Sequence, residues 1–184
     1  MSITTECAPV ASVSPLFLFS NEQTENVVIA SCDGNAVVVL DGSQSSDVEN
    51  DPLEFLWADG TNVIGSGQIA SNSFAIGTHS IVLMVNDGTD SAFTSLTLEV
   101  ITPAEAVAQL IAIVEDGNLP KNRKQPLRAN LNSAVRDFSR CRTAQGINQL
   151  KTFQSKINDW ITPTDPTLAG ELLQISNQII EAVE

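Results

Sequence analysis

The sequence has no tyrosine and only one histidine among its 184 residues, and its other aromatic residues are seven phenylalanines and two tryptophans. Binding of sugars through a row of exposed aromatic rings would require a larger supply of such residues. Nucleophilic hydrolysis requires a histidine that converges with a serine and a carboxylate, and no motif places His79 in that setting. We therefore expect no enzyme activity.

Lysine and arginine are absent from the first 102 positions, which contain 13 Asp or Glu residues. The remaining 82 positions contain nine Lys or Arg and nine Asp or Glu, so the net charge of −13 comes from the first segment. A wholly anionic domain repels nucleic acid and favours divalent cations or basic partners. The break in composition predicts two domains, 1–102 and 103–184, and no nucleic-acid binding.

Long apolar runs and metal-binding cysteine motifs are also missing. No stretch approaches the roughly 20 apolar residues of a membrane helix, so we expect no membrane insertion. The three cysteines form no CxxC pair, which excludes the usual zinc spacing. Cys7 and Cys32 lie in the same segment and are candidates for one disulfide, or else are separate buried side chains. Cys141 is then the odd residue, either free or available for a cross-link.

Residues 9–101 contain short runs of β-branched and aromatic residues between clusters of Gly, Asn, Asp and Ser. Within Ser80–Val85, apolar positions alternate with the period of two that is typical of strands. Turn signals such as Asp41-Gly42 and Asn86-Asp87-Gly88 separate the runs. The pattern predicts an antiparallel β-sandwich of about seven strands.

The hydrophobic period changes after this segment. The order Thr102-Pro103-Ala104-Glu105 supplies a capping threonine, a proline at the first helical position and a glutamate three residues after the cap. Apolar residues then follow at helical spacing until Gly117. The same spacing predicts helices over about 122–142 and 143–161, and another after the break at Pro163–Pro166. We expect a separate small bundle of three or four helices.

Two motifs of the β segment carry a family resemblance. The first is Val39-Leu40-Asp41-Gly42-Ser43-Gln44-Ser45-Ser46-Asp47, continued by Asp51-Pro52-Leu53-Glu54-Phe55-Leu56-Trp57, and the second is Ile76-Gly77-Thr78-His79-Ser80-Ile81-Val82-Leu83-Met84-Val85-Asn86-Asp87-Gly88. They resemble the signature of polycystic-kidney-disease (PKD) domains and cover about residues 9–101. The resemblance implies an immunoglobulin-like sandwich with Trp57 in its core. It also implies a structural role for His79, where relatives often carry a tyrosine.

The helical segment has a second resemblance, over about residues 104–182. The matching residues are Asn118-Leu119-Pro120-Lys121, Leu127, Leu131, Ala134, Ala144, Gly146-Ile147-Asn148-Gln149-Leu150 and Phe153. This pattern is similar to the FIMAH type of short helical domain, found at the ends of secreted multidomain prokaryotic proteins. Both resemblances imply an extracellular or cell-surface protein.

Acidic residues of the β segment suggest a calcium site. Asp47, Glu49 and Asp51 alternate in one loop, and Asp87 lies in another loop that a sandwich can bring close. Some PKD domains bind calcium through residues equivalent to Asp47, Glu49 and Asp87. The alternative is that these residues are solvated turn formers.

Basic residues gather on the second predicted helix and its entry. The residues that form this basic face are Arg123, Lys124, Arg128, Arg136 and Arg140. A solvated helix face is one explanation, and docking onto an acidic sandwich is the other.

The main functional hypothesis is a non-catalytic spacer or adhesion module. One alternative is a polysaccharide-binding accessory module of a secreted enzyme, and another is a self-assembling filament subunit. The expected partners are proteins or polysaccharides at the cell surface, or further copies of the chain.

Overall fold

A computed structural model describes residues 10, 14–15, 19–21 and 24–184. The chain divides into two compact units. The first consists of Met1–Val28 and Ala36–Val100, and the second of Ile29–Asn35 and Ile101–Glu184. The units differ from the predicted domains in two respects: the boundary lies after Val100 instead of after residue 102, and the segment Ile29–Asn35 belongs with the helices. This segment contains Cys32, which matters for the disulfide described below.

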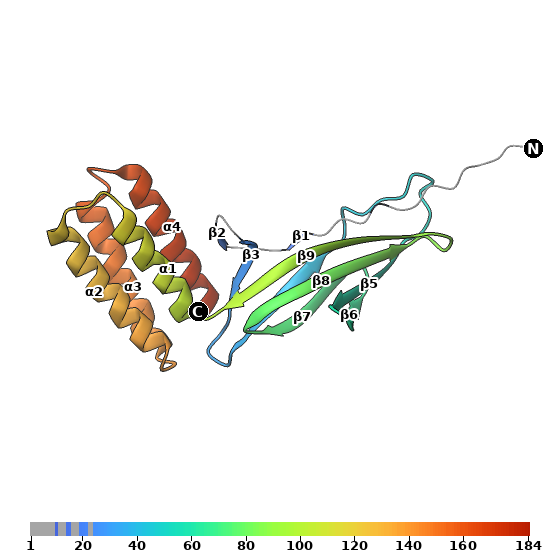
Figure 1. Ribbon diagram of the computed structural model, residues 1–184, viewed down its shortest axis with the longest axis horizontal. Coiled ribbons are helices and arrows are strands. Elements are labelled where there is room, and N and C mark those ends of the chain that lie inside the picture. Colours follow the sequence, from blue (N-terminus) through green and yellow to red (C-terminus); the bar gives the residue numbers. More distant parts are fainter. Residues whose placement is uncertain (1–9, 11–13, 16–18, 22–23) are drawn as a thin grey trace, which may run out of the picture. The chain divides into compact units, whose positions relative to one another are not determined.

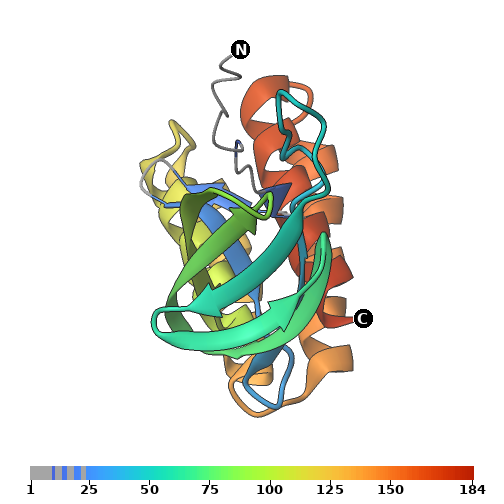
Figure 2. The same cartoon turned by 90° about the vertical axis from the view of Figure 1, so that its right-hand side faces the viewer.

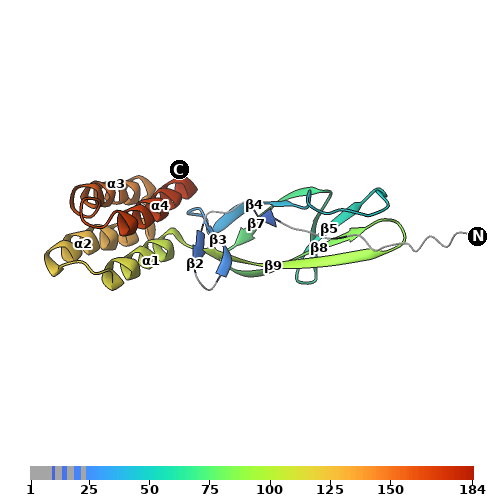
Figure 3. The same ribbon diagram turned by 90° about the horizontal axis from the view of Figure 1, so that it is seen from above.

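The first unit contains two β-sheets (Figures 1 and 3). The three-stranded sheet has the order β1 (Ser14–Pro15), β4 (Asn35–Asp41) and β7 (Ile69–Ala75). The six-stranded sheet has the order β2 (Phe19–Asn21), β3 (Thr24–Ile29), β9 (Ser91–Ile101), β8 (Gly77–Asn86), β5 (Glu54–Asp59) and β6 (Asn62–Ser66). Nine strands thus lie within the described residues, where the sequence predicted about seven.

Two of these strands, β6 and β7, have weak signals in the sequence. The sequence of β6 is Asn-Val-Ile-Gly-Ser, and β7 carries two serines and an asparagine, so neither has a continuous β-branched run. Each is an edge strand of its sheet, where polar residues are tolerated because one side of the strand is unpaired. Pairing with β5 fixes the position of β6.

The core of the first unit follows from alternation along the strands, which enclose a common interior seen end-on in Figure 2. On β8, Ile81, Leu83 and Val85 are fully buried, as the period of two predicts. Trp57 on β5 is also fully buried, and its indole N–H donates to the carbonyl oxygen of Gly67 at 2.8 Å. The expectation that Trp57 is a core residue is confirmed.

The second unit contains four helices: α1 (Pro103–Asp116), α2 (Lys121–Phe138), α3 (Thr143–Trp160) and α4 (Pro166–Val183). Helix α2 packs on α1 and α3, and helix α4 packs on the same two helices. The buried positions of each helix recur at helical spacing. None of the helices within residues 24–184 has the length and apolar character required to cross a membrane.

Helix α1 begins as the sequence predicts. The backbone N–H of Glu105 donates to the hydroxyl of Thr102 at 3.1 Å, and the backbone N–H of Thr102 donates to the Glu105 carboxylate at 2.8 Å. These two bonds form a capping box, which satisfies backbone donors that have no partner within the helix. Pro103 follows at the first helical position, where its missing N–H is not needed.

Candidate functional site

The outer face of the six-stranded sheet carries a groove of about 870 Å³. We call it the outer-face groove, and its lining includes Leu53, Glu54, Leu56, Gly67, Met84 and Asn86. Strands β5 and β8 contribute its wall, and the corner between β6 and β7 closes one side. The core behind it contains Trp57, which donates its indole N–H to Gly67.

An apolar row extends from this groove across three strands. Leu56 on β5 pairs with Met84 on β8, and Met84 pairs with Phe93 on β9. Directly opposed residues of an antiparallel pair lie on the same face, with Cβ atoms about 5 Å apart. Phe93 is 66% exposed, whereas the neighbouring core residues on the opposite face are buried. The apolar row of Leu56, Met84 and Phe93 therefore lies on the outer face, where Phe93 is exposed and Leu56 and Met84 are half-buried.

No motif of the sequence marks this row. Phe93 lies two positions from Ser91 and from Ser95 on β9, and residues two apart share a face of a strand. The sequence therefore indicated that Phe93 lies on the polar face. That signal was available. The neighbours of Phe93 depend on the register of β8 against β9, which no local pattern determines.

Carboxylates lie near one end of the groove. Glu54 lines it and pairs with Asn86, so the loop before β5 and the turn after β8 lie at the same end of the sheet. Glu49 and Asp51 are exposed in that loop, and Asp90 is exposed in the turn. With no lysine or arginine in the first 102 residues, this end of the unit is strongly anionic.

The predicted calcium residues Asp47, Glu49, Asp51 and Asp87 lie in these two loops, but the structure does not gather them into a site. Across residues 24–184 and the shorter described stretches before them, no three His, Cys, Asp or Glu side chains form a group able to hold a metal ion. Turn hydrogen bonds engage two of the four carboxylates, and calcium binding by these residues stays a prediction.

The first of these carboxylates is Asp47, which accepts the backbone N–H of Asp51 at 3.0 Å. The second is Asp87, which accepts the backbone N–H groups of Asp90 at 2.7 Å and Thr89 at 2.8 Å. Both bonds hold the pKa of Asp87 below its usual value. These contacts agree with the alternative reading of Asp47 and Asp87 as turn formers.

His79 is held by two hydrogen-bond acceptors. Its Nδ1 lies 2.6 Å from Oδ2 of Asp59, and its Nε2 lies 2.8 Å from the carbonyl oxygen of Ala75. Burial lowers the pKa of His79, but the Ala75 carbonyl, and then the hydrogen bond and charge of Asp59, raise it above its ordinary value. A neutral imidazole donates one proton, so only the protonated ring satisfies both acceptors.

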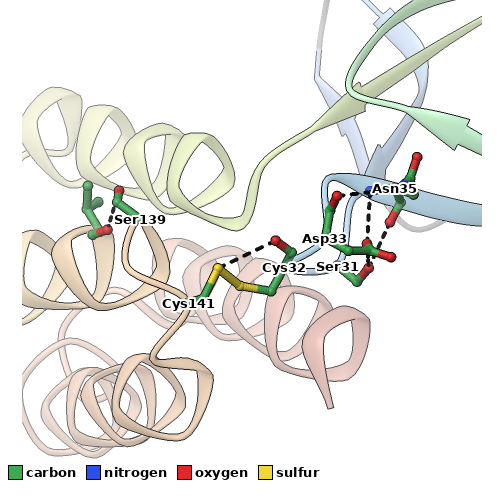
Figure 4. The surroundings of a disulfide bond; sticks show 7 residues. Ser31, Cys32, Asp33, Asn35, Ser139 and Cys141 are labelled. Carbon is green, nitrogen blue, oxygen red and sulfur yellow. Dashed lines mark hydrogen bonds between the residues drawn. A yellow bond between two sulfur atoms is a disulfide. The ribbon is translucent and has the colours of Figure 1, made fainter.

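The disulfide of the structure joins Cys32 to Cys141, with a Cα–Cα separation of 5.6 Å (Figure 4). Cys32 lies in the turn between β3 and β4, and Cys141 lies in the turn between α2 and α3. The candidate pairing of Cys32 with Cys7 is therefore wrong, and Cys141 forms a cross-link, which was one of its two expected states. Cys7 lies outside the described residues.

The error has a physical cause. The prediction assumed that Cys32 belongs with the β segment in which it occurs, whereas the turn Ile29–Asn35 is part of the compact unit of the helices. Side-chain hydrogen bonds hold that turn: the hydroxyl of Ser31 donates to the Asp33 carboxylate, and the backbone N–H of Asn35 donates to the same group at 3.1 Å (Figure 4). These bonds lower the pKa of Asp33.

Three of the five residues of the predicted basic face have partners on the neighbouring helices α1 and α3. Arg123 donates to the carbonyl oxygen of Trp160, and Lys124 donates to the carbonyl oxygen of Glu115. Arg128 forms an ion pair of 3.2 Å with the Glu115 carboxylate. These contacts join α2 to the end of α1 and to the end of α3.

The other two residues of that face lie further along the helix. Arg136 donates to the hydroxyl of Ser133 at 2.9 Å, and Arg140 is exposed just after α2 ends. The docking of this face on an acidic sandwich stays a prediction.

Neither a protein-family model nor a curated protein matches the sequence. Among solved structures, the chain is similar to a carbohydrate-binding module of the β-sandwich superfamily, with 21% identity and a TM-score of 0.41 over 54% of this chain and 36% of that one. It is also similar to a nucleoside hydrolase-related hypothetical protein from Saccharophagus degradans that is associated with carbohydrate metabolism, with 23% identity and a TM-score of 0.38 over 52% and 26% of the two chains.

A third similar structure contains fibronectin(III)-like modules of Clostridium thermocellum CbhA, with 18% identity and a TM-score of 0.30 over 42% of this chain and 88% of that one. The chain thus spans about a third of the length of the first of these structures and about a quarter of the second.

Proposed function

We propose that this chain is a non-catalytic adhesion or spacer module of an exported protein, built from a PKD-type sandwich and a FIMAH-like helical bundle. The observation that carries the proposal is the disulfide between Cys32 and Cys141. Structural disulfides form and persist in oxidising environments, and they are rare in the reducing cytosol of mesophilic cells. An extracellular or cell-surface location accounts for this bond.

The surroundings of the single histidine support a non-catalytic role. In a catalytic triad, Nδ1 of the histidine faces a carboxylate and Nε2 faces the nucleophile. Here Asp59 occupies the first position, but the backbone carbonyl oxygen of Ala75 occupies the second. A carbonyl oxygen has no proton for His79 to remove, so it is not a nucleophile that His79 can activate. The two hydrogen bonds of His79 instead attach β8 to Asp59 and Ala75.

The outer-face groove supports adhesion over a purely passive spacer. A spacer needs no concave surface lined by apolar side chains, whereas Leu56 and Met84 line the groove and the exposed Phe93 lies beside Met84. Exposed apolar patches beside a concave surface are typical of binding sites. In the described part of the chain, Phe93 is the only aromatic among the large exposed hydrophobic residues, which does not favour the stacked rings of a polysaccharide site.

The proposal is tested on protein from its natural source. Cells are lysed in the presence of an alkylating reagent and without reductant, and the digested protein is analysed by mass spectrometry. We expect a linked peptide pair that contains Cys32 and Cys141. In parallel, intact cells or their culture fluid are treated with protease, and we expect the chain to be accessible while a cytoplasmic enzyme of the same cells stays intact. Alkylation of both thiols, together with protection of the chain until lysis, would refute the proposal.

A further inference from the structure

The outer-face groove and the apolar row form one continuous surface. Leu56 and Met84 belong to both, because they line the groove and pair with each other across β5 and β8. Phe93 extends the surface onto β9. The volume of about 870 Å³ lies within the range of roughly 300–1,000 Å³ that is typical of ligand sites. A ligand on this surface would cover three apolar side chains from three adjacent strands.

Charge defines the chemistry of the ligand. Glu54 lines the groove, Glu49 and Asp51 are exposed in the loop that precedes it, and Asp90 is exposed in the turn beyond Asn86. No lysine or arginine occurs among the first 102 residues to offset these carboxylates. The summed potential of such a surface attracts cations and repels anions. Nucleic acids and acidic polysaccharides are therefore unsuited to the groove.

The nature of the apolar side chains decides between the remaining ligands. A neutral polysaccharide stacks its sugar rings on flat aromatic side chains, but the row offers one phenyl ring, one thioether and one aliphatic chain. Methionine is unbranched and adapts to irregular apolar partners, as in surfaces that accept many peptides. Leu56 and Met84 thus suit the apolar side chains of a polypeptide better than the face of a sugar.

We propose that the outer-face groove binds a polypeptide segment of a partner protein in which lysine or arginine residues alternate with apolar ones. Its apolar side chains cover Leu56, Met84 and Phe93, and its cations lie near Glu54 and the adjacent acidic loop. This inference rests on the proposed adhesion function and names the chemistry of its partner.

The test uses the full chain with its disulfide intact and a fluorescein-labelled peptide of about ten residues that alternates valine and lysine. Binding is measured by fluorescence anisotropy at about 0.05 M and about 0.5 M NaCl, where screening differs strongly. A second peptide with glutamate in place of lysine controls for charge. We expect the lysine peptide to bind, its affinity to fall at high salt, and the glutamate peptide not to bind.

Variants assign the binding to the groove. We expect Phe93→Ser to weaken binding about fivefold or more, as for the truncation of an aromatic interface residue that anchors a ligand. Glu54→Gln should weaken it roughly twofold to fivefold and reduce its salt dependence. The matched controls are Val37→Ser, which changes a 75% exposed valine of the three-stranded sheet, and Glu171→Gln, which changes an exposed carboxylate on α4. Both controls should bind within about twofold of the wild type.

Several outcomes would overturn the inference. One is the absence of binding to the lysine peptide, and another is equal binding by the wild type, Phe93→Ser and Glu54→Gln. Retention of a neutral β-glucan by the wild type but not by Phe93→Ser would identify a sugar site instead. Dimerisation in sedimentation that is lost in Phe93→Ser would identify a second copy of the chain as the occupant. None of these results depends on the thiol and protease measurements, so the exported location is tested separately.

Discussion

Removal of the Cys32–Cys141 disulfide should strongly destabilise the protein. The bond closes a loop with a sequence separation of 109 residues. In the chain-entropy model, a cross-link over roughly 100 residues restricts the unfolded chain and raises the free energy of unfolding by about 4.7 kcal/mol at 25 °C. Total stabilities of domains are about 5–15 kcal/mol, so the loss is a large fraction of what holds the chain folded. The value is at the upper end of the usual range because the closed loop is long.

The perturbation is the double variant Cys32→Ser with Cys141→Ser, compared with the wild type under non-reducing conditions. Urea unfolding is followed by circular dichroism, which reports the helices of the second unit, and by fluorescence in a Trp160→Phe background, which leaves Trp57 as the reporter of the first unit. We expect the midpoint to fall while the dependence of the free energy on urea stays similar. The free energies of unfolding are compared only if circular dichroism and fluorescence change over the same range of urea concentrations. A single free energy of unfolding is defined only for a two-state transition.

A Cys7→Ser variant is the matched control, because it removes a thiol and leaves the Cys32–Cys141 bond in place. It should unfold at the wild-type midpoint. Reduction should lower the free energy of unfolding of the wild type to that of the double serine variant. Reduction should not change the free energy of unfolding of the variant. A loss of less than about 1 kcal/mol in the double variant would refute the argument that the long loop stabilises the protein through the entropy of the unfolded chain.

Three further predictions concern single side chains. The pKa of His79 is raised in the folded protein, so the stability that its protonation adds is complete below the ordinary histidine value of 6.5 and is lost as the pH rises through the folded pKa. His79→Gln should flatten the pH dependence of thermal unfolding between those two pKa values. A pH profile equal to that of the wild type would contradict this. A Cβ at Gly146 would lie 2.6 Å from Phe138, so Gly146→Ala should destabilise by about 1–3 kcal/mol in urea unfolding, whereas Gly170→Ala, which meets no neighbour, should stabilise by up to about 1 kcal/mol. Trp57→Ala should destabilise by about 3–5 kcal/mol in the same assay, and a loss below about 1 kcal/mol would show that the core tolerates its absence.

Part of the site was within reach of sequence reasoning. The absence of lysine and arginine from the first 102 residues already pointed to cationic partners, and the structure adds Glu54 and an acidic loop beside a groove. The predicted calcium residues illustrate the limit, because Asp87 is as suited to capping a turn as to binding a cation. The backbone N–H groups of Thr89 and Asp90 are its partners in the structure, in agreement with the turn-forming alternative.

The sequence by itself determined where strands give way to helices. The period of two in Ser80–Val85 and the capping box at Thr102 depend on residues within a few positions of each other, and local backbone geometry follows from such neighbours. The sequence marks edge strands such as β6 less clearly, because their polar residues have no distinctive period.

Tertiary structure alone decided two features: the partner of Cys32 and the neighbours of Phe93. Cys141 is 109 positions from Cys32, and it reaches that residue because the turn Ile29–Asn35 belongs with the helices. Phe93 meets Met84 and Leu56 through the register of three strands. Both features are contacts between distant residues, which arise when the packing of whole elements is fixed and which local composition does not encode.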